Sequence, residues 1–149
     1  MKKFKFSLEA VRQLKNKIEE EAAQKHARAL VQVSKAKTDL AATERDLNAA
    51  ALMQFSANKK TPASELMQLN NYISALEKLR RERLDRCLHA EKDATLARAA
   101  LEKAAREREI LDRVHDHQHG VHKFHVARQE QKWMDEIAQK MKRGILAAV

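Results

Sequence analysis

The sequence predicts an all-α protein, in which two long helices pack as an antiparallel coiled-coil hairpin. Three observations lead to this fold. Pro62 is the only proline in 149 residues, and it separates two long segments without proline. Both segments are rich in strong helix formers, with 34% charged residues, 4% aromatic residues and two glycines, a composition typical of coiled coils. Apolar residues recur at spacings of three and four, which places them on one helix face.

The turn of the hairpin is expected near residues 57–62. Proline lacks an amide hydrogen and is tolerated only in the first turn of a helix. Thr61 and Pro62 are therefore predicted to be the N-cap and the first residue of the second helix. Glu65 then falls in the first turn, where a carboxylate interacts favourably with the helix dipole.

We expect one elongated helical domain over residues 1–149. The first helix is predicted over about residues 7–56, and the second, longer helix over about residues 63–143. Gly120 weakens the second helix near residues 117–121, because glycine costs up to about 1 kcal/mol in a helix interior.

The first helix is expected to bury one apolar stripe against the second. Ser7 is a suitable N-cap, and residues 1–6 before it are expected to be loose. The stripe begins with Val11, Leu14 and Ile18. From residue 33 it becomes a regular heptad, formed by Val33, Ala36, Leu40, Thr43, Leu47 and Ala50.

The second helix carries a longer heptad seam. Its positions are Leu66, Leu69, Ile73, Leu76, Arg80, Arg83, Cys87, Ala90, Ala94, Ala97, Leu101, Ala104, Arg108 and Leu111. The charges of Arg80 and Arg83 weaken the seam at its centre. A fold-back centred on residue 60 places Leu47 opposite Ile73 along this seam.

The end of the second helix has no partner within the chain, because the first helix runs out opposite residue 113 or so. This tail still carries an apolar stripe, formed by Val126, Trp133, Met134, Ile137 and Met141. Such a helix must project, fold back or bind another molecule.

The overall charge and the single cysteine limit the classes of function. A net charge of +9 favours acidic partners, which include an acidic protein surface, nucleic acid and anionic lipid. Cys87 excludes an internal disulfide and is expected to be a small buried residue, with a reactive thiol as the lesser alternative. The basic start is not followed by an apolar segment, and no run of 18 apolar residues occurs, so we expect a cytoplasmic protein without a membrane span.

Five histidines within eleven residues resemble a metal site. His115, His119 and His122 share one helix face and could hold zinc or nickel. No second cysteine and no HExxH motif supports this, so a solvated, pH-responsive segment is the preferred interpretation, and no cofactor is expected.

No residues indicate catalysis. The chain has no glycine-rich phosphate loop, and two packed helices offer no cavity in which a nucleophile and a base could meet, so we expect a protein that is not an enzyme. Basic clusters at residues 2–17 and 80–86 leave nucleic-acid binding as an alternative, although glutamates interleave with them and aromatics for base stacking are scarce.

Three segments, in order along the chain, resemble the flagellar FliJ family of the type III export apparatus. Residues 4–11 are similar to the family's Phe-x-Phe-x-Leu-Glu start. Residues 72–78 resemble its aromatic-Ile-x-x-Leu-Glu-Lys stretch, and residues 128–138 its Glu-x-Lys-x-x-Asp-Glu tail. Departures are Arg83, where some members carry histidine, and the lack of tyrosines in the second half of the first helix.

The resemblance implies a stalk similar to the γ subunit of rotary ATPases. Such a stalk enters and stimulates the hexameric export ATPase ring, contacts the cytoplasmic domain of the export-gate membrane protein and handles export chaperones. By correspondence, Tyr72, Leu76 and Leu79 face the gate. We expect residues 1–20 and 110–149 to face the ring, and the candidate ring-binding residues are Phe4, Phe6, Val126, Trp133, Ile137 and Met141.

Two alternatives to the flagellar stalk remain. One is the equivalent coiled coil of a virulence type III secretion system, which neighbouring genes would identify. The other is a basic coiled coil that binds nucleic acid or metal, which salt-dependent DNA binding would reveal.

Overall fold

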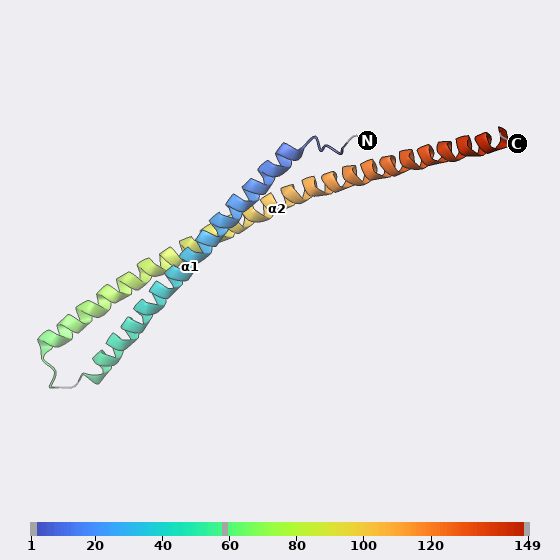
Figure 1. Ribbon diagram of the computed structural model, residues 1–149. Coiled ribbons are helices and arrows are strands. Elements are labelled where there is room, and N and C mark those ends of the chain that lie inside the picture. Colours follow the sequence, from blue (N-terminus) through green and yellow to red (C-terminus); the bar gives the residue numbers. More distant parts are fainter. Residues whose placement is uncertain (1–2, 58–59, 148–149) are drawn as a thin grey trace. The chain divides into compact units, whose positions relative to one another are not determined.

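Two helices make up almost all of the described chain (Figure 1). The computed structural model describes residues 3–57 and 60–147. Helix α1 runs over Glu9–Ser56 and the longer helix α2 over Ala63–Ala147, in the opposite direction. The described ranges contain no strand. The predicted all-α hairpin, with its turn near residues 57–62 and its longer second helix, is therefore confirmed.

The N-cap of α2 lies one residue later than predicted, although the helix itself begins at Ala63, the first residue of its predicted range. The carbonyl oxygen of Pro62 accepts hydrogen bonds from the amides of Glu65 at 3.1 Å and Leu66 at 3.2 Å. A residue whose carbonyl accepts the first helical bond occupies the N-cap position. Pro62 therefore occupies the N-cap position, which was predicted for Thr61. An N-cap residue donates no helical hydrogen bond from its amide, so proline is tolerated there as it is at the first helical position. Glu65 does lie in the first turn, where its charge interacts favourably with the helix dipole.

The start of α1 also differs from the prediction. The Leu8 carbonyl accepts a hydrogen bond from the Arg12 amide at 2.9 Å, so Leu8 and not Ser7 occupies the N-cap position. Glu9 supplies the acidic residue of the first turn. At the other end, the Ala57 amide donates to the Met53 carbonyl at 3.1 Å and closes the last turn.

The chain divides into two compact units, each of which contains part of both helices. Unit 1 combines Met1–Ile18 with Ala104–Val149, and unit 2 is Glu19–Lys103. Unit 2 includes the turn of the hairpin.

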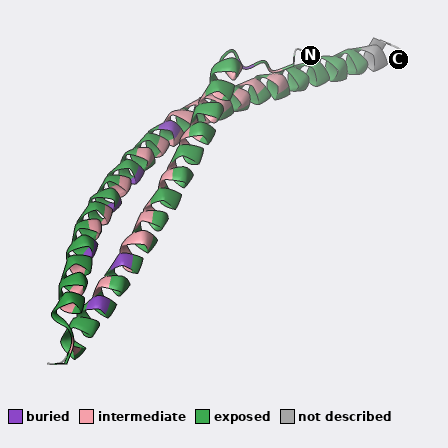
Figure 2. Cartoon of the chain, turned by 90° about the vertical axis from the view of Figure 1, so that its left-hand side faces the viewer, coloured by how far each residue is buried: buried purple, intermediate pink, exposed green. Residues whose placement is uncertain are grey.

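A regular coiled-coil seam holds unit 2 together. Figure 2 shows the buried and half-buried residues along the helices of the hairpin. On α1 they follow alternating steps of three and four, through Glu19, Ala22, His26, Ala29, Val33, Ala36, Leu40, Thr43, Leu47 and Ala50. On α2, all predicted seam positions in this unit except the exposed Arg80 are buried or half-buried. Most of the fully buried side chains are small, which lets the two backbones approach closely.

The apolar stripe predicted for the start of α1 is wrong. Val11, Leu14 and Ile18 are 38–55% exposed, whereas Arg12 and Lys15 are turned toward α2. The heptad of α1, followed backwards from Glu19, reaches these two basic residues and not the apolar ones. Carboxylates on α2 pair with them, so that charge complementarity replaces apolar packing at these two positions of α1.

Cross-helix pairs lie about four residues further along α2 than a fold-back at residue 60 predicts. In unit 2, Gln54 donates to Asn70 at 2.8 Å. In unit 1, Arg12 donates to Asp112 at 2.7 Å. Helical side chains lean toward the N-terminus of their own helix, so that in an antiparallel pair both partners carry higher numbers than their backbone positions suggest. This lean explains part of the shift.

Helix α2 continues through the segment that was predicted to be weak. Residues 117–121 are helical, and a Cβ added to Gly120 would meet no atom within 4 Å. From residue 127 to residue 143 every side chain is exposed. This last part of α2, residues 127–143, is called the tail below.

Candidate partner-binding surfaces

The tail carries the exposed apolar stripe that the sequence predicts. Trp133 and Met141 are 66% and 65% exposed, and Ile137 is 38% exposed. Val126, just before the tail, is half-buried. Spacings of seven and four residues place Val126, Trp133 and Ile137 on one helix face. An apolar surface with an aromatic anchor is the kind that binding interfaces use.

Phe4 and Phe6, which were predicted to bind the hexameric ATPase, are packed against α2 within unit 1. Phe6 is 7% exposed, and its ring meets that of His115 edge-on, with 5.1 Å between the centroids. The Phe4 ring lies 5.6 Å from His115, 5.0 Å from His119 and 5.5 Å from His122. The expectation of a loose start is therefore wrong for Phe4 and Phe6. That these two residues bind the export ATPase stays a prediction.

The histidine cluster is an aromatic contact surface. The imidazoles of His115 and His119 are 5.9 Å apart. Within residues 3–57 and 60–147, no three His, Cys, Asp or Glu side chains are placed to hold a metal ion. His115 Nδ1 instead lies 3.0 Å from the Asp116 carboxylate, within hydrogen-bond distance. The spacing of the histidines indicated a shared face, but no pattern in the chain predicted that Phe4 would cover it.

A charged network, which sequence analysis missed, fixes α1 against α2 in unit 1. Asp112 accepts a hydrogen bond from Arg12 at 2.7 Å and another from Arg108 at 2.6 Å. Lys15 and Glu107 form a second pair at 2.6 Å. The hydrogen bond from Arg12, with that from Arg108 and the charges of both, lowers the pKa of Asp112. The same hydrogen bond raises the pKa of Arg12.

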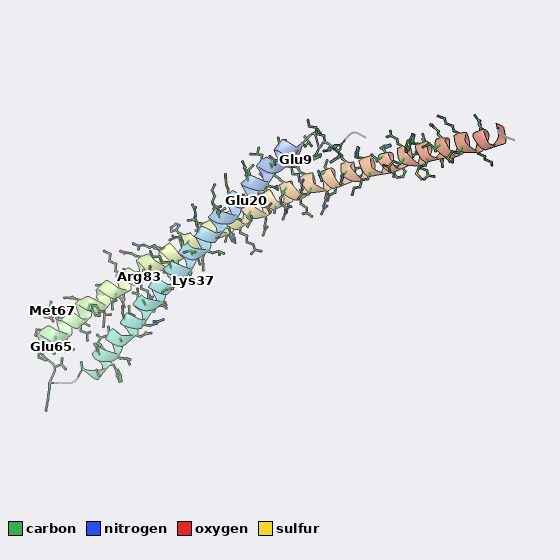
Figure 3. All side chains as sticks on the ribbon, viewed as in Figure 1. Glu9, Glu20, Lys37, Glu65, Met67 and Arg83 are labelled. Carbon is green, nitrogen blue, oxygen red and sulfur yellow. The ribbon has the colours of Figure 1, made fainter. Side chains whose placement is uncertain are left out.

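Near the turn, the residues predicted to face the export gate differ in exposure. Tyr72 is 51% exposed, Leu79 is half-buried and Leu76 is 7% exposed. Leu76 packs in the hairpin seam, as its heptad position requires. Met67 lies next to the labelled Glu65 at the start of α2 and is 68% exposed (Figure 3). An apolar surface that a partner could reach therefore involves Tyr72 and Met67 more than Leu76.

Arg83 is used inside unit 2. Its guanidinium donates to the hydroxyl of Thr43 and to the carbonyl of Asp39, both on α1. Thr43 is fully buried and donates to the same carbonyl at 3.1 Å. Figure 3 shows Arg83 on α2 near Lys37 on α1, and Lys37 pairs with Glu91 at 2.8 Å. The basic cluster at residues 80–86 thus contributes one of its arginines to the seam, which reduces the charge it offers to nucleic acid.

Cys87 is 6% exposed and lies in the seam of unit 2, where it acts as a small buried residue. Among the described residues, no helix is both long and apolar enough to cross a membrane.

Comparison with known proteins identifies a family. The family model described as "Flagellar FliJ protein" matches residues 4–143, which is nearly the whole chain. No curated protein and no solved structure matches the chain. The match covers unit 2 with the turn, most of unit 1 and the whole tail. This chain, an α-helical hairpin with an exposed helical tail, belongs to the FliJ family of flagellar type III export components.

Proposed function

We propose that the protein is the coiled-coil stalk of the flagellar export apparatus, and that its tail binds the hexameric export ATPase and stimulates it. The exposed stripe of Trp133, Ile137 and Met141, which follows the half-buried Val126 on the same face, is the observation that carries this proposal. A helix face with a large aromatic residue and no covering side chains is suited to insertion between the helices of a ring. Membership in the FliJ family supports a role for the chain in the flagellar export apparatus.

Charge supports the same assignment. The chain carries a net charge of +9, and Lys140, Lys142 and Arg143 are exposed at the end of the tail. A basic helix is steered toward an acidic opening, and the gain appears mainly in the rate of association. Binding that weakens with added salt is the corresponding expectation.

The turn region of unit 2 is proposed to contact the cytoplasmic domain of the export-gate membrane protein. Tyr72 and Leu79 are seven residues apart and so share a face of α2, to which both contribute exposed area. Leu76 supports this face from the seam. The protein would then act in the cytoplasm, attached peripherally to the inner membrane through the export apparatus, and would hand on empty export chaperones without itself catalysing a reaction.

A pull-down with the export ATPase tests the tail. Deletion of residues 126–149 should abolish capture, and Trp133→Ala or Ile137→Ala should each weaken it by about tenfold or more, as expected for an interface anchor. Gln139→Ala, on the opposite face of the tail, is the matched control and should bind normally. Full capture by the truncated chain would refute the assignment of the tail to the ring.

A second pull-down, with the cytoplasmic domain of the gate protein, tests the turn region. Tyr72→Ala should reduce capture, whereas the exposed Glu77→Ala, on the other side of α2, should not. Equal capture by both variants would remove Tyr72 from the proposed gate surface. Since the two pull-downs use different regions, one assignment can fail while the other stands.

A further inference from the structure

The N-terminal segment over residues 3–7, called the strap, rests on an imidazole face of α2 in unit 1. This face consists of His115, His119 and His122. The strap is neither helix nor strand, so its place is fixed mainly by its two rings. Phe4 contacts all three imidazoles, with centroids 5.0–5.6 Å away, and Phe6 is buried against His115.

Histidine is an unusual choice for such a contact, because leucine or phenylalanine would cover the rings more effectively. Neutral imidazoles pack against phenylalanine edge-on or tilted, which is the arrangement seen here. An imidazole also gains a proton in the range near neutral pH. The contact therefore has two states that differ in charge, whereas an apolar contact would have one.

The surrounding charges decide which state holds the strap. Asp116 is within hydrogen-bond distance of His115 and can balance one added proton. Asp112 is already engaged by Arg12 and Arg108. Other charged residues lie close in sequence to the strap or to the imidazole face, and most of them are basic. They are Lys3 and Lys5 in the strap, Glu9 on α1, and Arg113 and Lys123 on α2.

One protonated imidazole is therefore tolerated, and its attraction to the face of Phe4 even favours the contact. A second or third is not, because the imidazoles of His115 and His119 are only 5.9 Å apart and face a strap that carries two lysines. Each additional proton adds like-charge repulsion and must be hydrated, which the covering rings prevent.

We propose that the strap is a pH-sensitive latch, docked by Phe4 and Phe6 when the imidazole face is neutral and released when two or more of its histidines are protonated. The undocked state binds more protons, so docking is favoured at higher pH and is lost as the pH falls through the imidazole range. Val126 and Trp133 continue the same face of α2 at helical spacing. Release of the strap thus uncovers the stretch of α2 that leads into the tail, whatever partner the tail binds.

The test is amide order in the strap of the full, ¹⁵N-labelled chain. The {¹H}–¹⁵N heteronuclear NOE of residues 3–7 is measured at about pH 7.5 and about pH 5.5, on either side of the ordinary imidazole range. The NOE of residues 3–7 should fall at the lower pH from values like those of the helices to values typical of a free chain end. Equal order at both pH values would overturn the latch.

Matched variants show whether these three imidazoles are responsible. His117→Gln and His125→Gln change exposed histidines outside the strap contact and should leave the transition in place. His119→Gln removes one titrating ring next to Phe4, so release should require a lower pH, and an unchanged midpoint counts against the latch. The double variant His119→Arg with His122→Arg places two permanent charges beside Phe4 and should release the strap even at about pH 7.5, the neutral end of the range; a strap that stays docked in this double variant would also refute the proposal.

Discussion

Unit 2 and unit 1 are formed by the same two helices but are held together by different interactions. The seam of unit 2 buries small and apolar side chains such as Ala50, Leu76 and Cys87. In unit 1, ion pairs join Arg12 to Asp112 and Lys15 to Glu107, and aromatic rings pack on imidazoles. Burial of apolar area depends little on pH, whereas exposed ion pairs and imidazoles respond to pH and salt. Unit 1 is therefore expected to respond to pH and salt more strongly than unit 2.

The largest expected effect tests the apolar seam of unit 2. Leu76→Ala should lower the free energy of unfolding by roughly 2–4 kcal/mol, because it removes a side chain that is only 7% exposed. Urea unfolding followed by circular dichroism measures this loss. Leu96→Ala, at a position 69% exposed on the same helix, should change stability by less than about 0.5 kcal/mol. Similar losses in both variants would mean that unit 2 does not depend on its seam.

The next effect tests the one polar contact inside that seam. Thr43→Val leaves Arg83 without one of its two oxygen acceptors and should cost about 1–2 kcal/mol. Arg83→Met replaces the charge by an apolar chain of similar length, and the double variant should recover much of the loss. A double-mutant cycle measures the coupling. Additive single effects would show that the contact between Arg83 and Thr43 is energetically unimportant.

A smaller effect is expected in unit 1, where helix propensity matters because little packs on α2. Gly120→Ala should stabilise the helix locally by about 0.5–1 kcal/mol, since a Cβ there meets nothing within 4 Å. Slower amide hydrogen exchange at residues 117–123 is the measurement. Ala127→Gly, at an exposed position about two helical turns further along α2, should destabilise the helix and make local amide exchange faster. Faster exchange in Gly120→Ala would indicate that the glycine serves a role beyond its flexibility.

The smallest expected effect concerns acid. The pKa of Asp112 is lowered by its hydrogen bond with Arg12, so its contribution to stability is present above its ordinary value of 3.8 and is lost as the pH falls through the lowered pKa. Amide exchange of residues 9–18 should therefore become faster in acid well below that value, and Asp112→Asn should remove this dependence. An identical acid response in Asp112→Asn would transfer the effect to other carboxylates.

The sequence was sufficient for the architecture of unit 2 and for the tail. A single proline marks the turn, and the heptads that begin at Val33 and Leu66 mark the seam, because both depend on residues close together in the chain. Arg83 was correctly placed in the seam, but its interaction with Thr43 was not foreseen, since it links residues 40 positions apart.

Unit 1 was predicted less well. Val11, Leu14 and Ile18 have the spacing of a buried stripe, and an apolar stripe is normally the buried one. The residue that faces α2 is Arg12, because it pairs with a carboxylate 100 positions away. This pairing can be predicted only when the register of the hairpin is known. The contacts of Phe4 come from a segment without regular structure, for which periodicity predicts nothing.

The way in which the tail stays helical has a consequence for experiments with peptides. Helix formation is limited by the first turn, after which each further residue is added cheaply, and isolated helices of fewer than about 15 residues are marginal in water. Residues 127–143 need no such first turn, because α2 already reaches them from Ala63. A synthetic peptide of the tail is only slightly longer than this limit and would have to nucleate by itself, so it would be less helical than the tail within α2 and its weaker binding would underestimate the tail. Conversely, a proline placed just before the tail would interrupt α2, so that the tail would lose the helix from which it propagates. Binding by the tail would then be lost although none of its own side chains is changed.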